Sequence, residues 1–156
     1  MKFILQAGGT ESDNLALKGI AMANAGFGNH IITNKIEHPA ILNTCKALEN
    51  MGFKITYLNV DNLGRISLEE LENAITRKTI LISIMFANNE IGTIQPIKEI
   101  GNIAKKHNII FHTDSVQAMG NVNINVRDLK IDSLSMSGHK FYGPKGVRGF
   151  ICKRGN

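Results

Sequence analysis

The sequence predicts a three-layer α/β/α sandwich around a seven-stranded, mixed and mostly parallel sheet whose last strand runs antiparallel. Apolar runs typical of strands alternate with segments of helical periodicity along the chain. The run at residues 79–87 is almost continuously apolar, as expected for a central parallel strand that is covered on both faces. The last apolar run follows the sixth too closely for a helical crossover, so we expect it to be antiparallel.

Each expected strand is a short apolar run bounded by turn residues. The fifth, for example, contains Ile109, Ile110 and Phe111 and ends at a polar segment. The seven expected strands cover residues 3–6, 30–36, 54–60, 79–87, 109–113, 132–137 and 149–153.

Four expected helices lie between these strands, at residues 11–25, 38–50, from Ser67 onward, and 96–107. In the first, apolar residues recur at helical spacing. The second tolerates Pro39 because the first turn needs no backbone N–H at that position. The third opens with an N-cap serine, Ser67, and a glutamate, Glu70, three residues on.

Length and composition indicate one globular domain spanning residues 1–156. The chain is 43% hydrophobic and 20% charged, which is ordinary for a domain with a sizeable core. Its formal charge of +5 comes from scattered lysines and arginines, so we expect no nucleic-acid binding. No signal peptide or bilayer-spanning stretch is expected. The two cysteines, Cys45 and Cys152, have no metal-ligand spacing, and a cytoplasmic, reducing location is expected.

A lysine near the end of the chain carries the first chemical signal. Lys140 follows an apolar strand and a Ser-Gly-His turn, and Phe141 and Tyr142 come directly after it. An amine that loses solvation in such surroundings can attack a carbonyl and hold it as a Schiff base. The alternative is a surface lysine in a basic loop.

Two further segments fit the same chemistry. Asp114 ends the fifth strand, where open α/β sheets place ligand contacts, although it could also be a solvated loop residue. A carboxylate in this position suits pyridoxal phosphate, whose ring nitrogen needs one to stay protonated. Gly8, Gly9 and Thr10 open a helix, which creates an anion cradle of backbone N–H groups.

Five motifs together resemble the cysteine desulfurases, which belong to the class V aminotransferase group of pyridoxal phosphate enzymes. The motifs keep the family's order and are Gly8–Asn14, Glu37–Ala40, Asn88–Gly92, His112–Gln117 and Ser137–Lys140. The resemblance implies the large domain of fold-type I enzymes, with a seventh, antiparallel strand. It also implies that the family's N-terminal segment and C-terminal domain are lacking here.

The resemblance assigns the catalytic roles to Lys140 and His38. Lys140 is expected to bind the cofactor covalently and then to shuttle the Cα proton of the substrate. Its competitor, Lys145, lies in a Gly-Pro-Lys-Gly context that suits a surface loop. His38 is expected to stack on the cofactor ring and to relay protons, although a histidine at a helix start is also a common structural cap.

The remaining implied contacts hold the ring and the phosphate of pyridoxal 5′-phosphate. Asp114 is expected at the pyridine nitrogen, and Gln117 and Asn89 near the phenolic oxygen. Asn88 and Asn89 could instead be plain turn residues. The phosphate is expected on the amides of Gly9 and Thr10 and on the side chains of Thr10, Ser137 and His139.

The implied reaction converts L-cysteine to L-alanine and transfers the sulfur to an enzyme cysteine. The implied partners are a sulfur-acceptor or iron–sulfur scaffold protein and a second copy of the chain in a homodimer, with no membrane. A selenocysteine lyase, and a non-catalytic domain or gene remnant, are the alternatives. A P-loop nucleotide binder is disfavoured because no Gly-x-x-x-x-Gly-Lys-Ser/Thr occurs.

The family's sulfur-accepting cysteine and its carboxylate-binding arginine lie beyond the lysine, and neither Cys45 nor Cys152 matches that cysteine. We therefore expect no turnover from this chain by itself. Of the other histidines, His112 is expected to be structural, and His30 and His107 to lie on the surface.

Overall fold

The computed structural model describes residues 2–6, 9–88, 90–118, 124–137 and 148–152. Within these residues one sheet has the strand order β1-β7-β6-β5-β4-β2-β3. Strands β6, β5, β4, β2 and β3 are parallel neighbours, and β7 pairs antiparallel with both β6 and β1. The strands are β1 Lys2–Gln6, β2 His30–Asn34, β3 Lys54–Leu58, β4 Thr79–Ser83, β5 Ile110–Asp114, β6 Ser133–Ser137 and β7 Arg148–Cys152.

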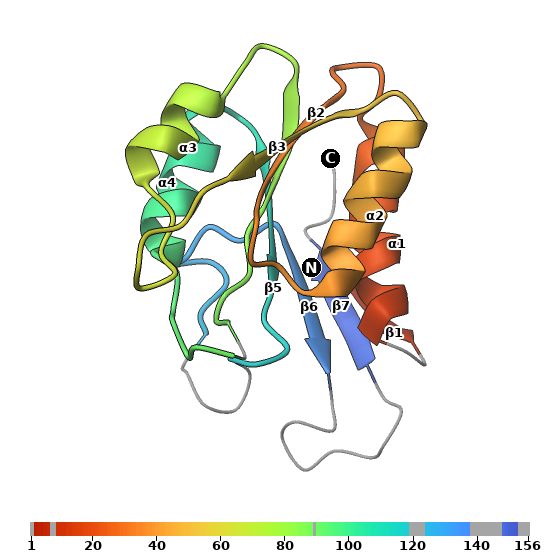
Figure 1. Ribbon diagram of the computed structural model, residues 1–156. Helices are drawn as coiled ribbons and strands as arrows, with labels where there is room; N and C mark the ends of the chain where they lie inside the picture. Colours follow the sequence, from red (N-terminus) through yellow and green to blue (C-terminus); the bar gives the residue numbers. More distant parts are fainter. Residues whose placement is uncertain (1, 7–8, 89, 119–123, 138–147, 153–156) are drawn as a thin grey trace.

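Helices cover both faces of the sheet (Figure 1). The four described helices are α1 Gly9–Ala23, α2 Pro39–Asn50, α3 Leu68–Ala74 and α4 Ile97–Lys106. Helices α1 and α2 pack together on one face, and α3 and α4 lie on the other. This arrangement confirms the predicted α/β class, and five of the strands form a parallel sheet. None of the helices in the described part of the chain has the length and apolarity that crossing a membrane needs.

Two separate cores explain why β2 and β4 each have consecutive apolar residues at their middle. On the α1–α2 face, Ile31 and Leu81 belong to one buried cluster. Their sequence neighbours Ile32 and Ile82 belong with Phe111 to the cluster on the α3–α4 face. Because successive strand residues point to opposite faces, a strand covered on both sides has consecutive apolar residues, one for each core.

Several strands are shorter than the sequence predicted, and β4 shows the reason. It was expected to reach residue 87 but ends at Ser83. Beyond it, the backbone N–H of Met85 donates to the side chain of Glu37 at 2.7 Å, rather than to a neighbouring strand. A side chain has replaced the ladder on the side facing β2, which periodicity alone could not indicate, while the Ile84 and Phe86 N–H groups still donate to backbone oxygens of β5.

The predicted N-cap of α3 is confirmed, but its capping box is only half formed. Ser67 Oγ accepts from the Glu70 N–H at 3.2 Å. The Glu70 carboxylate turns instead to Asn59, accepting from its backbone and side-chain N–H groups at 3.2 and 3.3 Å. It therefore ties α3 to the end of β3 rather than to its own cap.

The expectation that His30 lies on the surface is wrong. Its ring is buried in the central strand β2, between the hydroxyls of Thr79 on β4 and Thr56 on β3, at 2.7 and 2.8 Å. Desolvation, followed by the charge of Lys54, lowers its pKa. Because hydroxyl partners on both neighbouring strands satisfy the ring, a polar residue is accommodated in the sheet.

The strand order reverses between β2 and β4. After β2 the chain forms α2 on one face of the sheet and continues into β3 at the sheet edge. After β4 it forms α4 on the opposite face and continues into β5, on the other side of β4. Ligands of open α/β sheets bind where neighbouring strands send their connections to opposite faces, outside the carboxyl ends of the strands. The topology therefore points to the end of β2 and β4 as a site.

A close approach of α4 to the 125–131 segment yields a test of the packing. A Cβ added at Gly101 would lie 2.1 Å from the backbone oxygen of Leu129, whereas one at Gly19 in α1 meets nothing within 4 Å. We expect Gly101→Ala to lower the free energy of unfolding by about 1–3 kcal/mol. Gly19→Ala, the matched helical control, should be neutral or stabilising by about 0.5–1 kcal/mol. Urea denaturation of the two variants measures both, and equal stabilities would contradict the close contact.

Candidate functional site

Most of the predicted site segments meet at one edge of the sheet, called here the carboxyl edge, where β2, β4, β5 and β6 end. Strand β1 also ends there, because β1 and β6 are both antiparallel to β7. The edge therefore carries Gly9 and Thr10 at the start of α1, His38 after β2, and Ser137 at the end of β6. The predicted residues Asn89, His139 and Lys140 lie outside the described residues.

Asp114 is the last residue of β5 and is buried. Its Oδ1 accepts from the Val116 N–H at 2.9 Å, which shapes the turn beyond the strand. Its backbone oxygen accepts from the Phe86 N–H at 2.8 Å, which ties β5 to the segment after β4. Gln117 is half-buried in the same turn. The carboxylate is thus held at a fixed place on the carboxyl edge.

His38 is the N-cap of α2 and is exposed. Its Nδ1 accepts from the Ala40 N–H at 3.2 Å, so the capping alternative is seen in the structure. A neutral ring whose Nδ1 accepts carries its hydrogen on Nε2. Capping therefore orients the imidazole and leaves a donor at its far end.

Glu37 is the feature that sequence reasoning missed. Its side chain is buried, and Oε1 accepts from Asn34 Nδ2 at 2.6 Å and from the Met85 N–H at 2.7 Å. The residue lies where the strand order reverses, between the segments that follow β2 and β4. The available signal was an acid directly behind a buried strand, two residues before the proline of a helix start.

Burial is the main influence on the charge of Glu37 and raises its pKa well above the ordinary value of 4.5. The Met85 N–H opposes this shift, while the charges of Asp114 and Asp13 raise the pKa further. Both aspartates are buried as well. Three acids thus gather near the carboxyl edge, and the arrangement favours the neutral form of Glu37.

His112 is structural, as expected. It is fully buried on β5, with Nδ1 2.9 Å from Ser83 Oγ on β4 and Nε2 3.0 Å from Ser135 Oγ on β6. Desolvation lowers its pKa to about 3, so the ring is neutral. It links three parallel strands just before they reach the carboxyl edge.

Cys45 is not a nucleophile in this fold. Its thiol is fully buried in α2, and burial, then the charges of Glu37 and Glu49, raise its pKa to about 12. Only the thiolate reacts, so a buried thiol of this kind is inert. Cys152 lies on β7.

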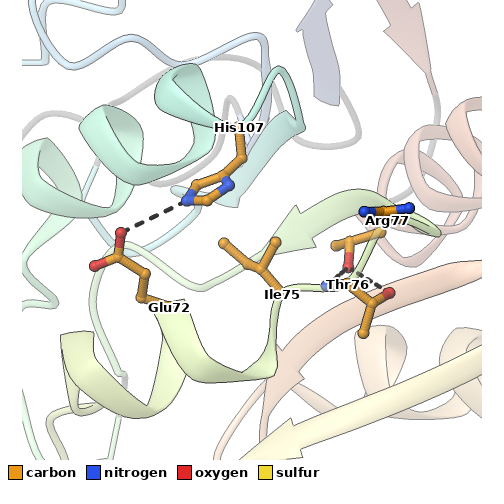
Figure 2. A pocket seen from close by; sticks show the side chains of 6 residues that line it. Glu72, Ile75, Thr76, Arg77 and His107 are labelled. Atoms are coloured by element: carbon orange, nitrogen blue, oxygen red, sulfur yellow. Dashed lines mark hydrogen bonds and ion pairs between the residues drawn. The ribbon is translucent and has the colours of Figure 1, made fainter.

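A cavity of about 370 Å³ lies at the opposite edge of the sheet, where β4 begins (Figure 2). Four of its polar lining residues, Glu72, His107, Thr76 and Thr79, already have polar partners. Glu72 contacts Lys106 and lies 3.5 Å from His107 Nε2, and Thr79 Oγ1 accepts from the Thr76 N–H at 2.8 Å. Because parallel sheets bind ligands at the carboxyl ends of their strands, we do not assign this cavity to the site.

These features are typical of an α/β enzyme domain that binds a phosphorylated ligand at its carboxyl edge: a helix N-terminus, a buried carboxylate and a reversal of strand order meet there. The chain belongs to the aminotransferase class-V family, whose model matches residues 2–155.

Its curated relatives include cysteine desulfurases from bacteria and archaea. Cysteine desulfurase IscS of Clostridium botulinum (strain Kyoto / Type A2) is 64% identical over 149 residues, which are 96% of this chain and 38% of that protein. The enzyme of the same name from Methanosarcina thermophila is 63% identical over 149 residues, 96% of this chain and 37% of that protein. The chain thus spans about two fifths of the length of these relatives.

The chain is also similar to solved structures with the same fold. A structure described as a NifS-like protein has a TM-score of 0.93 and 42% identity, covering 99% of this chain and 43% of that one. A structure described as SspA in complex with cysteine has a TM-score of 0.90 and 48% identity, covering 95% of this chain and 43% of that one.

The raised pKa of Glu37 predicts a pH-dependent stability. Above pH 4.5 the unfolded chain releases this proton while the native chain keeps it, so the free energy of unfolding falls as pH rises. The slope from one such group is at most about 1.4 kcal/mol per pH unit, and it ends at the pKa of the native state. Glu37→Gln removes this loss, so the variant should gain stability relative to wild type as pH increases.

Urea denaturation at several pH values above 4.5 measures this difference. Glu99→Gln, at an exposed position in α4, is the control and should follow the wild-type curve. Parallel curves for wild type and Glu37→Gln would show that Glu37 is ionised in the native chain.

Proposed function

We propose that this chain forms the pyridoxal 5′-phosphate-binding part of a cysteine desulfurase. The observation that carries the proposal is the 64% identity to a cysteine desulfurase over 96% of this chain. The fold supports it, because the described residues among those expected to hold the cofactor lie at the carboxyl edge. We further infer that the seven-stranded sheet with its antiparallel β7 is the large-domain sheet of fold-type I enzymes.

The residues present at the carboxyl edge fit this cofactor. Its phosphate needs an anion site, and α1 begins at Gly9 with backbone N–H groups that no helical carbonyl can satisfy. Its ring nitrogen needs a carboxylate, and Asp114 offers one in a fixed position. When bound, the cofactor supplies an electron sink for the bond changes at the substrate Cα.

The proposed roles follow from these positions. Asp114 holds the proton on the ring nitrogen, and Gln117 and Asn89 contact the phenolic oxygen. His38, oriented by its cap, lies against the ring and moves a proton through Nε2. Lys140 binds the cofactor covalently and then moves the Cα proton. Gly9, Thr10, Ser137 and His139 would hold the phosphate.

The proposed substrate is L-cysteine, whose sulfur passes to a cysteine thiolate while L-alanine is released. Cys45 does not suit this transfer because its thiol is buried and its pKa is raised to about 12. We propose a sulfur-acceptor or iron–sulfur scaffold protein as partner, a homodimer as the assembly, and the cytoplasm as the location.

The first test maps the covalent cofactor site. Pyridoxal 5′-phosphate followed by borohydride should label one peptide, which contains Lys140, because a desolvated amine at the site reacts first. Lys140→Ala should abolish this labelling, and Lys145→Ala, five residues further along, should leave it intact. Peptide mass mapping gives the answer. Label spread over many lysines would contradict a preformed site.

The second test removes the proposed partner of the ring nitrogen. Asp114→Asn keeps an oxygen that can accept from the Val116 N–H, while it removes the charge and replaces the second oxygen with an NH2 group. We expect pyridoxal 5′-phosphate to bind about tenfold more weakly or worse, with a shifted visible absorbance band, since a hydrogen bond to a charged group contributes about 1.5–3 kcal/mol. Unchanged affinity and absorbance in the folded variant would remove Asp114 from the site.

A further inference from the structure

The two sides of the reversal point are joined by one side chain. Glu37 Oε1 accepts from Asn34 Nδ2, at the end of β2, and from the Met85 N–H, just beyond β4. A second contact runs in parallel, because Asn88 Nδ2 donates to the Ile36 backbone oxygen at 3.1 Å. The segments that follow β2 and β4 are therefore fastened to each other, although their helices lie on opposite faces of the sheet.

Each of these segments is also connected to a residue proposed to contact the cofactor. On one side, Glu37 directly precedes His38, the N-cap of α2. On the other side, Met85 is followed by Phe86, whose N–H donates to the Asp114 backbone oxygen at 2.8 Å. A continuous path of covalent bonds and hydrogen bonds thus runs from His38 through Glu37 and Met85 to Asp114.

We propose that Glu37 is a positioning residue for the cofactor, which braces the segment carrying His38 against the segment that holds Asp114. This proposal rests on the proposed function for its cofactor, but the brace itself is a property of the chain. Catalytic and binding groups need support of this kind, because displacements of about an ångström greatly reduce binding and rate.

The surroundings of Glu37 suit an acceptor that stays neutral. The acids Asp13 on α1 and Asp114 on β5 act on it from two elements, and Cys45 on α2 is also close enough to interact electrostatically. Burial and the two aspartates all raise its pKa. A neutral carboxyl accepts both N–H groups through Oε1 without placing a second negative charge beside Asp114.

The test compares three variants of the chain. Glu37→Gln keeps a neutral acceptor oxygen, whereas Glu37→Ala removes it. Glu70→Ala is the matched control, because Glu70 likewise accepts a backbone N–H and an asparagine amide, from Asn59, but lies beside the edge strand β3. The two readouts are the affinity for pyridoxal 5′-phosphate, followed by its visible absorbance, and the hydrogen exchange of the Met85 amide in the cofactor-free chain.

We expect Glu37→Ala to weaken pyridoxal 5′-phosphate binding about tenfold or more and to speed exchange at Met85 by a similar factor. Glu37→Gln should restore both, and Glu70→Ala should change neither. A folded Glu37→Ala that binds like wild type would overturn the proposal. The proposal would also be overturned if Glu37→Gln bound pyridoxal 5′-phosphate as weakly as Glu37→Ala, because loss of the acceptor oxygen would then not explain the weaker binding.

Two further outcomes would also test whether the Glu37 brace exists. If Glu37→Ala does not fold, Asn34→Ala can replace it, because it removes one of the two donors to Glu37. This variant should bind pyridoxal 5′-phosphate about threefold more weakly. Wild-type affinity would count against the brace. If the wild-type chain takes up no pyridoxal 5′-phosphate, the proposed function and the cofactor role of Glu37 both fail. Met85 exchange then decides whether the brace exists by itself.

Discussion

The reversal of strand order between β2 and β4 is the constraint on which the carboxyl edge depends. The chain leaves these neighbouring strands toward opposite faces, so beyond their ends the two segments no longer pair with each other by backbone hydrogen bonds. A buried N–H left without an acceptor costs about 1–3 kcal/mol. The Met85 N–H is such a donor, and Glu37 satisfies it with a side chain where the sheet no longer offers a carbonyl.

Further hydrogen bonds extend this support across the edge. The Phe86 N–H donates to the Asp114 backbone oxygen. The backbone N–H and the hydroxyl of Ser115 both donate to the Ser135 backbone oxygen on β6, at 3.0 and 2.8 Å. Just inside the edge, the His112 ring lies between hydroxyls of β4 and β6. Each strand end is thus fixed to the next, which is the rigidity that a preorganised ligand site needs.

Repulsion between buried carboxylates explains the charge states at the carboxyl edge. Asp13, Glu37 and Asp114 are all buried, and three ionised carboxylates so close together would repel one another with little solvent to screen them. The raised pKa of Glu37 lowers that repulsion by one charge. In the proposed function, the protonated cofactor ring then supplies a positive partner for Asp114.

The sequence was enough to predict the α/β class, because strand and helix periodicities depend on the residues alone. It also located the N-cap at Ser67 and the structural character of His112, and it placed Asp114 at a strand end. Which distant residues meet is visible only in the folded chain. The burial of His30 depends on hydroxyls from two other strands, and the role of Glu37 depends on a backbone N–H 48 positions away. Local patterns hold no information about such contacts, because the crossing order of the strands creates them.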